Sequence, residues 1–411
     1  MVKFEIQKVF CRTSARIALL LLLAVLGVTC FLATDVSYIN ENGDRESGPA
    51  AIAKLKAAQQ EWSGELDEEQ LRRVIRENRR IRESPEAQVD NLRMNDIAYS
   101  RGQGIREIRN LLNSSYAEGF QEYDYYRADS LTEEDASSFY TNRVKLLADW
   151  LDVDVKDQFS DAEKKFLLRK YEELETPFSI DYMKGWTQLF EFAPTIMMVT
   201  ILILGYLVGG IFSNEFMWRS DAIFFSARNG RDQATAAKIK AGICMATVIY
   251  WAVLLVYTAA VLLYLGGEGW ACPVQADQSG WKSIYHITVL EKYILIAAGG
   301  YIGCLFISAL SMLVSAKTRS TVVAVLVPFI LIFIPSFLAN INSPAVARLL
   351  GFLPDQLLQT GTALGMFNLC SLGEKVTGAV PVLLGLYTVL AVVILPVIYR
   401  EYGGKEVGGD M

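Results

Sequence analysis

The residue types that most often carry catalysis are few in this chain. His286 is the only histidine, so no H-E-x-x-H zinc site can form, and the charged block before it cannot hold a Ser-His-Asp triad. The six cysteines include no C-x-x-C pair, which argues against a zinc site or a disulfide framework. Gly373-Glu-Lys375 lacks the upstream glycine and the hydroxyl residue of a phosphate-binding G-x-x-x-x-G-K-[ST] loop. We therefore expect no catalytic centre, no metal site and no cofactor in this chain.

Three other groups of residues could bind a ligand or form a disulfide, and each also has a purely structural interpretation. The acidic runs Glu133-Glu134-Asp135 and Asp152–Asp157 could bind cations, but such runs usually form a solvated helix face or a cap. The aromatic residues within Tyr116–Tyr126 could form a binding surface, although we expect them to be the core of a charged helical region. Cys272 and Cys370 both fall in loops expected on the outer side, where they could pair.

The segment Gly209–Lys240, which connects two apolar stretches, contains both charged and aromatic residues. We expect Ser213 or Asn214 to cap a new helix with Glu215 in its first turn. An amphipathic helix over Phe216–Phe225 and a Ser-Ala-Arg-Asn-Gly-Arg turn would follow, leading into the next apolar stretch. A segment of this size is too small for catalysis and suits docking against a partner.

The chain contains six apolar stretches of the length that crosses a bilayer, about 20 residues each. We predict an all-α polytopic membrane protein with six transmembrane helices and a mainly helical extracellular domain between the first two. The predicted boundaries are residues 1–34 for the N-terminus and first helix, 35–185 for the extracellular domain, and 186–411 for the remaining part. Within that last part we expect helices at about 186–212, 241–265, 291–315, 320–340 and 379–399, a cytoplasmic coupling segment at 213–240, and re-entrant or interfacial helices at 343–378.

The orientation follows from the distribution of lysine and arginine. Alternate connections contain 13 of these residues on one side and four on the other, and the richer side is normally cytoplasmic. Both termini are therefore expected in the cytoplasm and residues 35–185 outside. A cleaved signal peptide at Ile17–Ala33 is the alternative, but the apolar run is longer than usual for one.

The block between the first two spans is charged and helical in pattern. Asp35–Lys184 carries 32 acidic and 22 basic residues, without a basic aromatic patch that would suggest nucleic acid. Glu68–Glu83 has helical apolar spacing, and Ser130-Leu-Thr-Glu133 and Ser160-Asp-Ala-Glu163 resemble capping boxes that open further helices.

Ionisable residues within spans, which usually mark ion or proton pathways, are almost absent. Glu191 and Glu291 lie at outer ends and are expected to be interfacial anchors, which disfavours ion-coupled transport. Pro328 and Pro335 in the fifth span would kink it and are candidates for a gating element.

The segment after the second span resembles the coupling region of ABC-2 type ABC transporter permeases. The resemblance is good over Ile211–Lys240 and loose over Pro177–Tyr399, including Pro177–Trp186 and Leu353-Pro-Asp355. It implies that Glu215 opens a helix contacting an ATPase and that basic residues steer that contact. The implied coupling residues are Glu215, Phe216, Ser226, Arg228, Gly230, Arg231 and Lys238. An ordinary loop of cytoplasmic basic residues would also explain part of this pattern.

That resemblance implies the permease subunit of an ATP-driven exporter in a bacterial plasma membrane. ATP and Mg²⁺ would be bound by a separate ABC ATPase subunit, and a second permease copy or a homologous permease would complete the assembly. The cargo expected is a lipid, a peptide or another amphiphile. The rival hypothesis is a membrane-anchored sensor or assembly protein whose extracellular helical domain binds a partner. An intramembrane enzyme is disfavoured because paired aspartates, a Ser/His dyad and H-E-x-x-H are all missing.

Overall fold

The protein is mostly helical, and six of its helices are long and apolar enough to cross a membrane. The structure is a computed structural model and describes residues 1–226, 230–338, 346, 349–373 and 375–404. The expected number of spanning helices is thus confirmed. They are α2 (Thr13–Thr34), α9 (Lys184–Met217), α11 (Thr235–Leu265), α12 (Val289–Thr318), α13 (Thr321–Leu338) and α17 (Ala379–Gly403).

Two of these helices form the centre of the bundle. The most apolar window of α9 is 72% buried and that of α12 61%, against 22% in α2, α13 and α17. The outer helices expose large apolar side chains such as Phe31, Val322 and Val392, as expected of a lipid-facing surface. At Gly242 of α11, an added Cβ would collide with Met312 of α12, so this glycine permits the close approach of the two helices.

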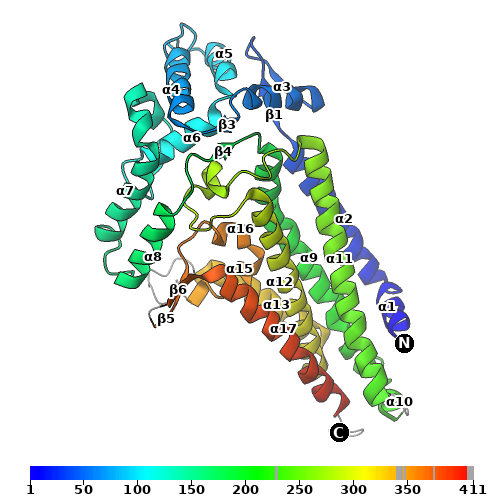
Figure 1. The fold of residues 1–411 in the computed structure, drawn as a ribbon. Coiled ribbons are helices and arrows are strands. Elements are labelled where there is room, and N and C mark those ends of the chain that lie inside the picture. Colours follow the sequence, from blue (N-terminus) through cyan, green and yellow to red (C-terminus); the bar gives the residue numbers. More distant parts are fainter. Residues whose placement is uncertain (227–229, 339–345, 347–348, 374, 405–411) are drawn as a thin grey trace.

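Residues 35–183, named the head below, form a helical unit at one end of the bundle (Figure 1). It contains two short antiparallel pairs. β1 (Ser37–Ile39) and β2 (Arg45–Ser47) form a hairpin at its start, and β3 (Gly64–Glu65) pairs with β4 (Ser179–Ile180) near its end. Its helices are α3 (Pro49–Gln60), α4 (Glu68–Arg82), α5 (Leu92–Gly102), α6 (Arg106–Ser115), α7 (Phe139–Asp152) and α8 (Asp161–Glu172), with the 3-10 turns η1 (Arg127–Ser130) and η2 (Glu133–Ser138).

The predicted helix starts in the head were partly correct. The capping box of Ser160 and Glu163 is confirmed at the start of α8. The box at Ser130 and Glu133 was wrong, because Thr132 and Asp135 form it instead and open η2. The Ser130 hydroxyl donates back to the Arg127 carbonyl, at 2.9 Å, and so cannot cap the following turn.

The expected aromatic core in Tyr116–Tyr126 is only partly present. Phe120 is buried and packs against Trp150, with ring centroids 5.0 Å apart, and against Phe367. Tyr125 and Tyr126, in contrast, are exposed, so the core interpretation was wrong for them. Tyr123 is exposed as well, although its hydroxyl donates to Asn110.

The segment after α13 is more varied than the predicted re-entrant helices. The described part contains two single-turn helices and a hairpin in which Gly373 takes a left-handed conformation, with φ of 64°. Residues 339–345, 347–348 and 374 of the predicted segment lie outside the described residues. The elements are α15 (Asp355–Leu358), α16 (Thr360–Ala363), β5 (Leu369–Leu372) and β6 (Lys375–Gly378).

A buried arginine fastens the head to the connection between α11 and α12, which contains η4 (Val274–Ala276) and η5 (Gln278–Gly280). The guanidinium of Arg143 donates to the carbonyls of Trp281 and Ser283, both at 3.2 Å, and stacks 3.7 Å from the ring centre of Tyr171. Burial lowers the pKa of Arg143 and raises that of Tyr171. Arginine keeps its charge even so, and stacking on an aromatic face stabilises it.

Replacing Arg143 with alanine should loosen this attachment. The change leaves the Trp281 carbonyl without its side-chain donor, leaves the Ser283 carbonyl with Gln275 alone and removes the stacking, which we expect to cost about 3 kcal/mol of unfolding free energy. Thermal unfolding and limited proteolysis of the head would measure it, with Lys145→Ala on the exposed face of the same helix as control. Equal stability of the two variants would contradict this role.

Candidate functional site

Four charged side chains form an ion cluster at the end of the bundle opposite the head. Here α1 (Val2–Phe10) lies against the last turn of α9 and the first turns of α11 (Figure 1). The Lys238 ammonium is 2.8 Å from Glu215 Oε1 and 2.9 Å from Glu5 Oε2, and Lys8 lies 2.6 Å from Glu215 Oε1. Two carboxylates and two ammonium groups thus balance in a buried position, which ties the N-terminal helix to two spans.

Further hydrogen bonds surround the Glu215–Lys238 pair. Ser220 Oγ donates to Glu215 Oε2 at 2.7 Å, and Lys238 also donates to the Ile211 carbonyl at 3.2 Å. Glu215 is 5% exposed and Lys238 0%. The charges of both residues are therefore paired within this chain.

These positions correct two expectations. Glu215 does not open a new helix, because α9 continues through Ser213 and Asn214 to Met217 and holds Glu215 in its last turns. Lys238 is fully buried, so the prediction that its charge steers a partner was wrong. The predicted helix over Phe216–Phe225 is also broken: the chain turns at Arg219, with φ of 54°, before the short helix α10 (Asp221–Ser226).

An aromatic cluster lies beside the ion cluster and is centred on Tyr402, near the end of α17. Tyr402 is fully buried, and its ring centre lies 4.7 Å from that of Phe212 and 6.0 Å from that of Phe216, both in α9. Phe224 and Phe225 of α10 lie 5.6 and 5.2 Å from it. α10 is therefore attached to the sixth span as well as to the second.

Beyond these anchors, the turn between α9 and α11 presents an apolar tip. Met217, Trp218 and Ile223 are exposed, Ile223 to 75%. The Arg12 guanidinium lies 5.2 Å from a ring centre of Trp218, so a cation covers one face of that side chain. These three residues, named the tip below, stand on a rigid base formed by the two clusters.

The other predicted coupling residues lie around the tip. Phe216 is half-buried with Arg319 stacked 5.0 Å from its ring centre, and Ser226 is exposed with its hydroxyl donating to the Ile223 carbonyl. Gly230 begins the π-helical turn η3 (Gly230–Ala234), and Arg231 within it is exposed. Arg228 lies outside the described residues.

The predicted gating prolines lie within one helix. Pro328 and Pro335 are both on the buried side of α13, which continues through them as a helix. Their role in gating stays a prediction.

Sequence reasoning missed three members of the site: Glu5, Lys8 and Tyr402. By sequence, Lys8 is one of the basic residues that orient the chain, and no local pattern marks Glu5. The available signal was that Glu5 is the only acidic residue before the first span. Its partner Lys238 is 233 positions away, so no local pattern reveals the contact.

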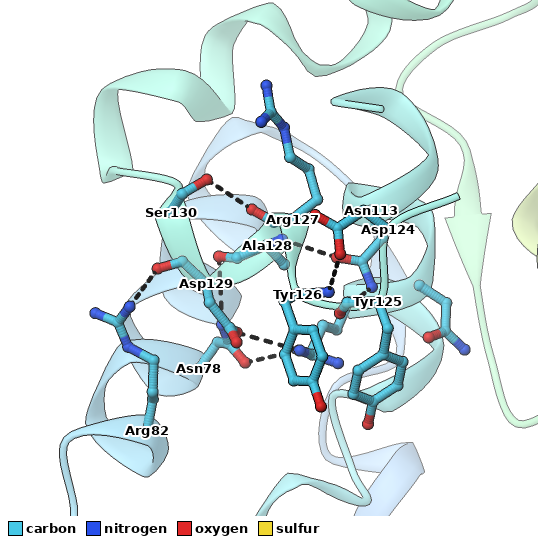
Figure 2. Close-up of polar contacts among 12 residues, drawn as sticks. Asn78, Arg82, Asn113, Asp124, Tyr125, Tyr126, Arg127, Ala128, Asp129 and Ser130 are labelled. Atoms are coloured by element: carbon cyan, nitrogen blue, oxygen red, sulfur yellow. Dashed lines mark hydrogen bonds and ion pairs between the residues drawn. The ribbon is translucent and has the colours of Figure 1, made fainter. Parts of the chain in front are cut away.

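The head contains a second candidate site, a cavity of about 480 Å³ between α4, α5 and the turn before η1. Figure 2 shows Tyr126 near Asn78, with Tyr125 beside Tyr126 and Arg82 on the other side of Asp129; Asn78 and Arg82 both bond to the η1 turn. Arg82 donates to the Asp129 carbonyl at 2.7 Å, and Arg109 stacks 4.4 Å from the ring centre of Tyr125. Exposed tyrosines beside arginines suit the recognition of an anionic ligand.

Within residues 1–226, 230–338, 346, 349–373 and 375–404, no three His, Cys, Asp or Glu side chains gather to hold an ion. Cys272, buried, and Cys370, half-buried, are both free cysteines.

The fold and the site define a class, a mostly helical polytopic membrane protein whose bundle ends in an anchored tip opposite a helical head. No protein-family model matches this chain, and no curated protein or solved structure matches it either. The resemblance to ABC-2 permeases, good over Ile211–Lys240 and loose over Pro177–Tyr399, therefore rests on the sequence alone.

Proposed function

We propose that this chain is the permease subunit of an ATP-driven exporter, coupled through its tip to a separate ABC ATPase. The observation that carries the proposal is the contrast between the tip and its base. Met217, Trp218 and Ile223 are exposed, whereas Glu215 before them is buried in the ion cluster and Phe225 after them is buried in the aromatic cluster. An apolar surface on a rigid base is what a docking partner requires in order to move the helices behind it.

The connections of the base support transmission into the bundle. Glu215 joins the second span to α1 and to the third span, and Tyr402 joins α10 to the sixth. A displacement of the tip therefore reaches several helices together. Glu215 acts here by positioning, while exposed Arg231 and the tip residues make the contact.

The orientation is part of the proposal. The tip end carries both described termini and the richer share of lysine and arginine, so it would be cytoplasmic, in a bacterial plasma membrane, with the head outside. A second permease copy or a homologous permease would complete the transporter, and the lipid bilayer surrounds it.

Changing the tip should remove the ATPase. We expect Ile223→Asp combined with Arg231→Glu to abolish co-purification of a stoichiometric ATP-binding subunit, because a buried carboxylate replaces the apolar contact and the second change reverses a charge. Ile223→Val is the matched control, since it keeps an apolar side chain at the same position. Mild-detergent purification, mass spectrometry and an ATPase assay measure the outcome.

Failure would be recognisable. A wild-type chain that purifies without an ATPase would contradict the exporter. A partner that binds the double variant as well as the wild type would contradict docking at the tip.

The cavity in the head favours one alternative function, a membrane-anchored sensor. Tyr126 is 69% exposed and its ring centre lies 5.2 Å from that of Tyr125, so both rings are available to a ligand. In that case, partners found in the same purification would be lost on Tyr125→Ala with Tyr126→Ala, and the tip variant would retain them.

A further inference from the structure

A cavity of about 540 Å³ opens at the head end of the bundle, in the volume range of small-molecule sites. The first turns of α9 and α12 form two of its walls, and the chain from Leu358 to Met366 forms the third. Its polar lining includes Thr187, Ser279 and Lys292 near the starts of the helices. Pro194 and Ile296 line it about one turn further along them.

Lys292 is the unusual member of this lining. The residue is only 6% exposed, and its ammonium lies 4.6 Å from the ring centre of Phe190. Among the residues that the structure describes, no carboxylate pairs with this ammonium and no acceptor bonds to it. The contrast with Lys238 is direct, since that buried lysine has two carboxylates and a carbonyl.

No carboxylate among the described residues forms an ion pair with Lys292. Asp277 acts on it only electrostatically, without a direct bond, and accepts instead from Thr187 Oγ1 at 3.4 Å and from the Ser279 backbone at 3.1 Å. Glu191, exposed at the edge of the cavity, accepts from Gln188 at 3.1 Å. Lys292 also stands in the first turn of α12, where the helix dipole disfavours a cation.

A buried cation without a partner lowers stability, and inside a membrane protein such a residue indicates a functional site. We propose that the cavity binds a single-chain or double-chain amphiphile with a phosphate or carboxylate head group, which pairs with Lys292 while the acyl chain lies along Phe190, Pro194 and Ile296. The apolar walls explain the preference for an amphiphile over a free anion, because an ammonium in an apolar setting attracts an anion strongly and the walls contribute only to a ligand with a chain.

This inference rests on the proposed function only in naming the exporter's cargo class, and binding to the cavity needs no ATPase. It is therefore tested on the purified full-length chain in neutral detergent. Lysophosphatidic acid, the uncharged monoolein and inorganic phosphate are each titrated, and the rise in Tm gives an apparent Kd for each. We expect lysophosphatidic acid to bind most tightly.

Two variants in the cavity should change this affinity in opposite directions. Lys292→Gln should weaken the binding of lysophosphatidic acid by about ten-fold or more, because a charge-assisted hydrogen bond to the head group is lost. Glu191→Gln should strengthen it, because a like charge is removed from the edge of the cavity. Lys375→Gln, an exposed lysine in β6, should leave it unchanged.

Two further measurements show whether a loss of amphiphile affinity comes only from a damaged fold. Lys292→Gln without ligand should be at least as stable as the wild type, since it removes a buried, unpaired charge. Gly365→Leu adds a side chain at the cavity wall, where a Cβ meets only ordinary contacts of 3.4 and 3.5 Å, and should weaken the amphiphile while Lys292 remains.

Several results would overturn the proposal. Equal affinity for monoolein would mean that the ammonium does not select the ligand. Inorganic phosphate binding as tightly as lysophosphatidic acid would mean that the site takes a free anion. An affinity unchanged by Lys292→Gln, or a chain destabilised by it in the absence of ligand, would also contradict the assignment. A wild-type chain that purifies without an ATPase but still binds the amphiphile would contradict the exporter alone.

Discussion

Replacing Lys238 with methionine is expected to destabilise the protein by about 3 to 5 kcal/mol, the usual cost of removing one partner from a buried ion pair. Glu5 and Glu215 would then share the single cation Lys8, and one of the two carboxylates would be buried without compensation. The N-terminal helix α1 should loosen first, because it loses the Glu5–Lys238 bond of 2.9 Å and keeps only the Lys8–Glu215 bond to the bundle.

Thermal unfolding of the purified chain measures this, together with protease cleavage near α1. Lys240→Met is the matched control, since Lys240 is exposed two positions along the same helix. Adding Glu215→Gln to Lys238→Met should recover part of the lost stability, because Glu5 and Lys8 then balance and the effects of residues in one network are not additive. Equal unfolding temperatures for Lys238→Met and Lys240→Met would show that the ion cluster contributes little.

The spanning helices could be predicted because each apolar run carries its own length signal. About 20 apolar residues are required by the bilayer, whatever the rest of the chain does. The capping box at Ser160 and Glu163 is equally local, since both partners lie within four residues. Features of this kind need no knowledge of the tertiary contacts.

The end of α9 could not be predicted because tertiary contacts decide it. Ser213 is of a residue type that favours caps, but its hydroxyl donates to the Gly209 carbonyl one turn back and bonds with Thr321 Oγ1 at 2.6 Å. The backbone N–H of Ser213 also has a partner in Ser315 Oγ, at 3.0 Å. The hydroxyl is therefore used within the helix and against neighbouring helices, and the helix continues.

The same limit applies to both candidate sites. The pairing of Lys8 with Glu215 joins positions 207 residues apart, and no sequence pattern shows that the two side chains meet. Lys292 was counted as one of four basic residues on the outer side, although it is buried in the structure. Whether a lysine is paired or unpaired depends on the packing of several helices, which local propensity does not contain.

Replacing Tyr402 with alanine is expected to separate docking of the partner from its effect. The change removes a buried ring that contacts Phe212 of α9 and Phe225 of α10, and truncating a buried aromatic side chain costs about 3 to 5 kcal/mol. The exposed tip keeps its own side chains, so an ATPase should still co-purify. The tip is then no longer held against the sixth span, so ATPase stimulation and transport should fall together.

Tyr402→Phe tests the physical cause of this effect, because it keeps the ring and its packing. We expect that variant to retain stimulation, and Ile223→Asp in the tip to lose the partner itself. The three variants, two at Tyr402 and one at Ile223, then give three different results, measured by co-purification, stimulated ATPase and Tm. A Tyr402→Ala protein with normal stimulated ATPase would show that movement does not pass through the aromatic cluster, and coupling would have to run through Glu215 and the ion cluster alone.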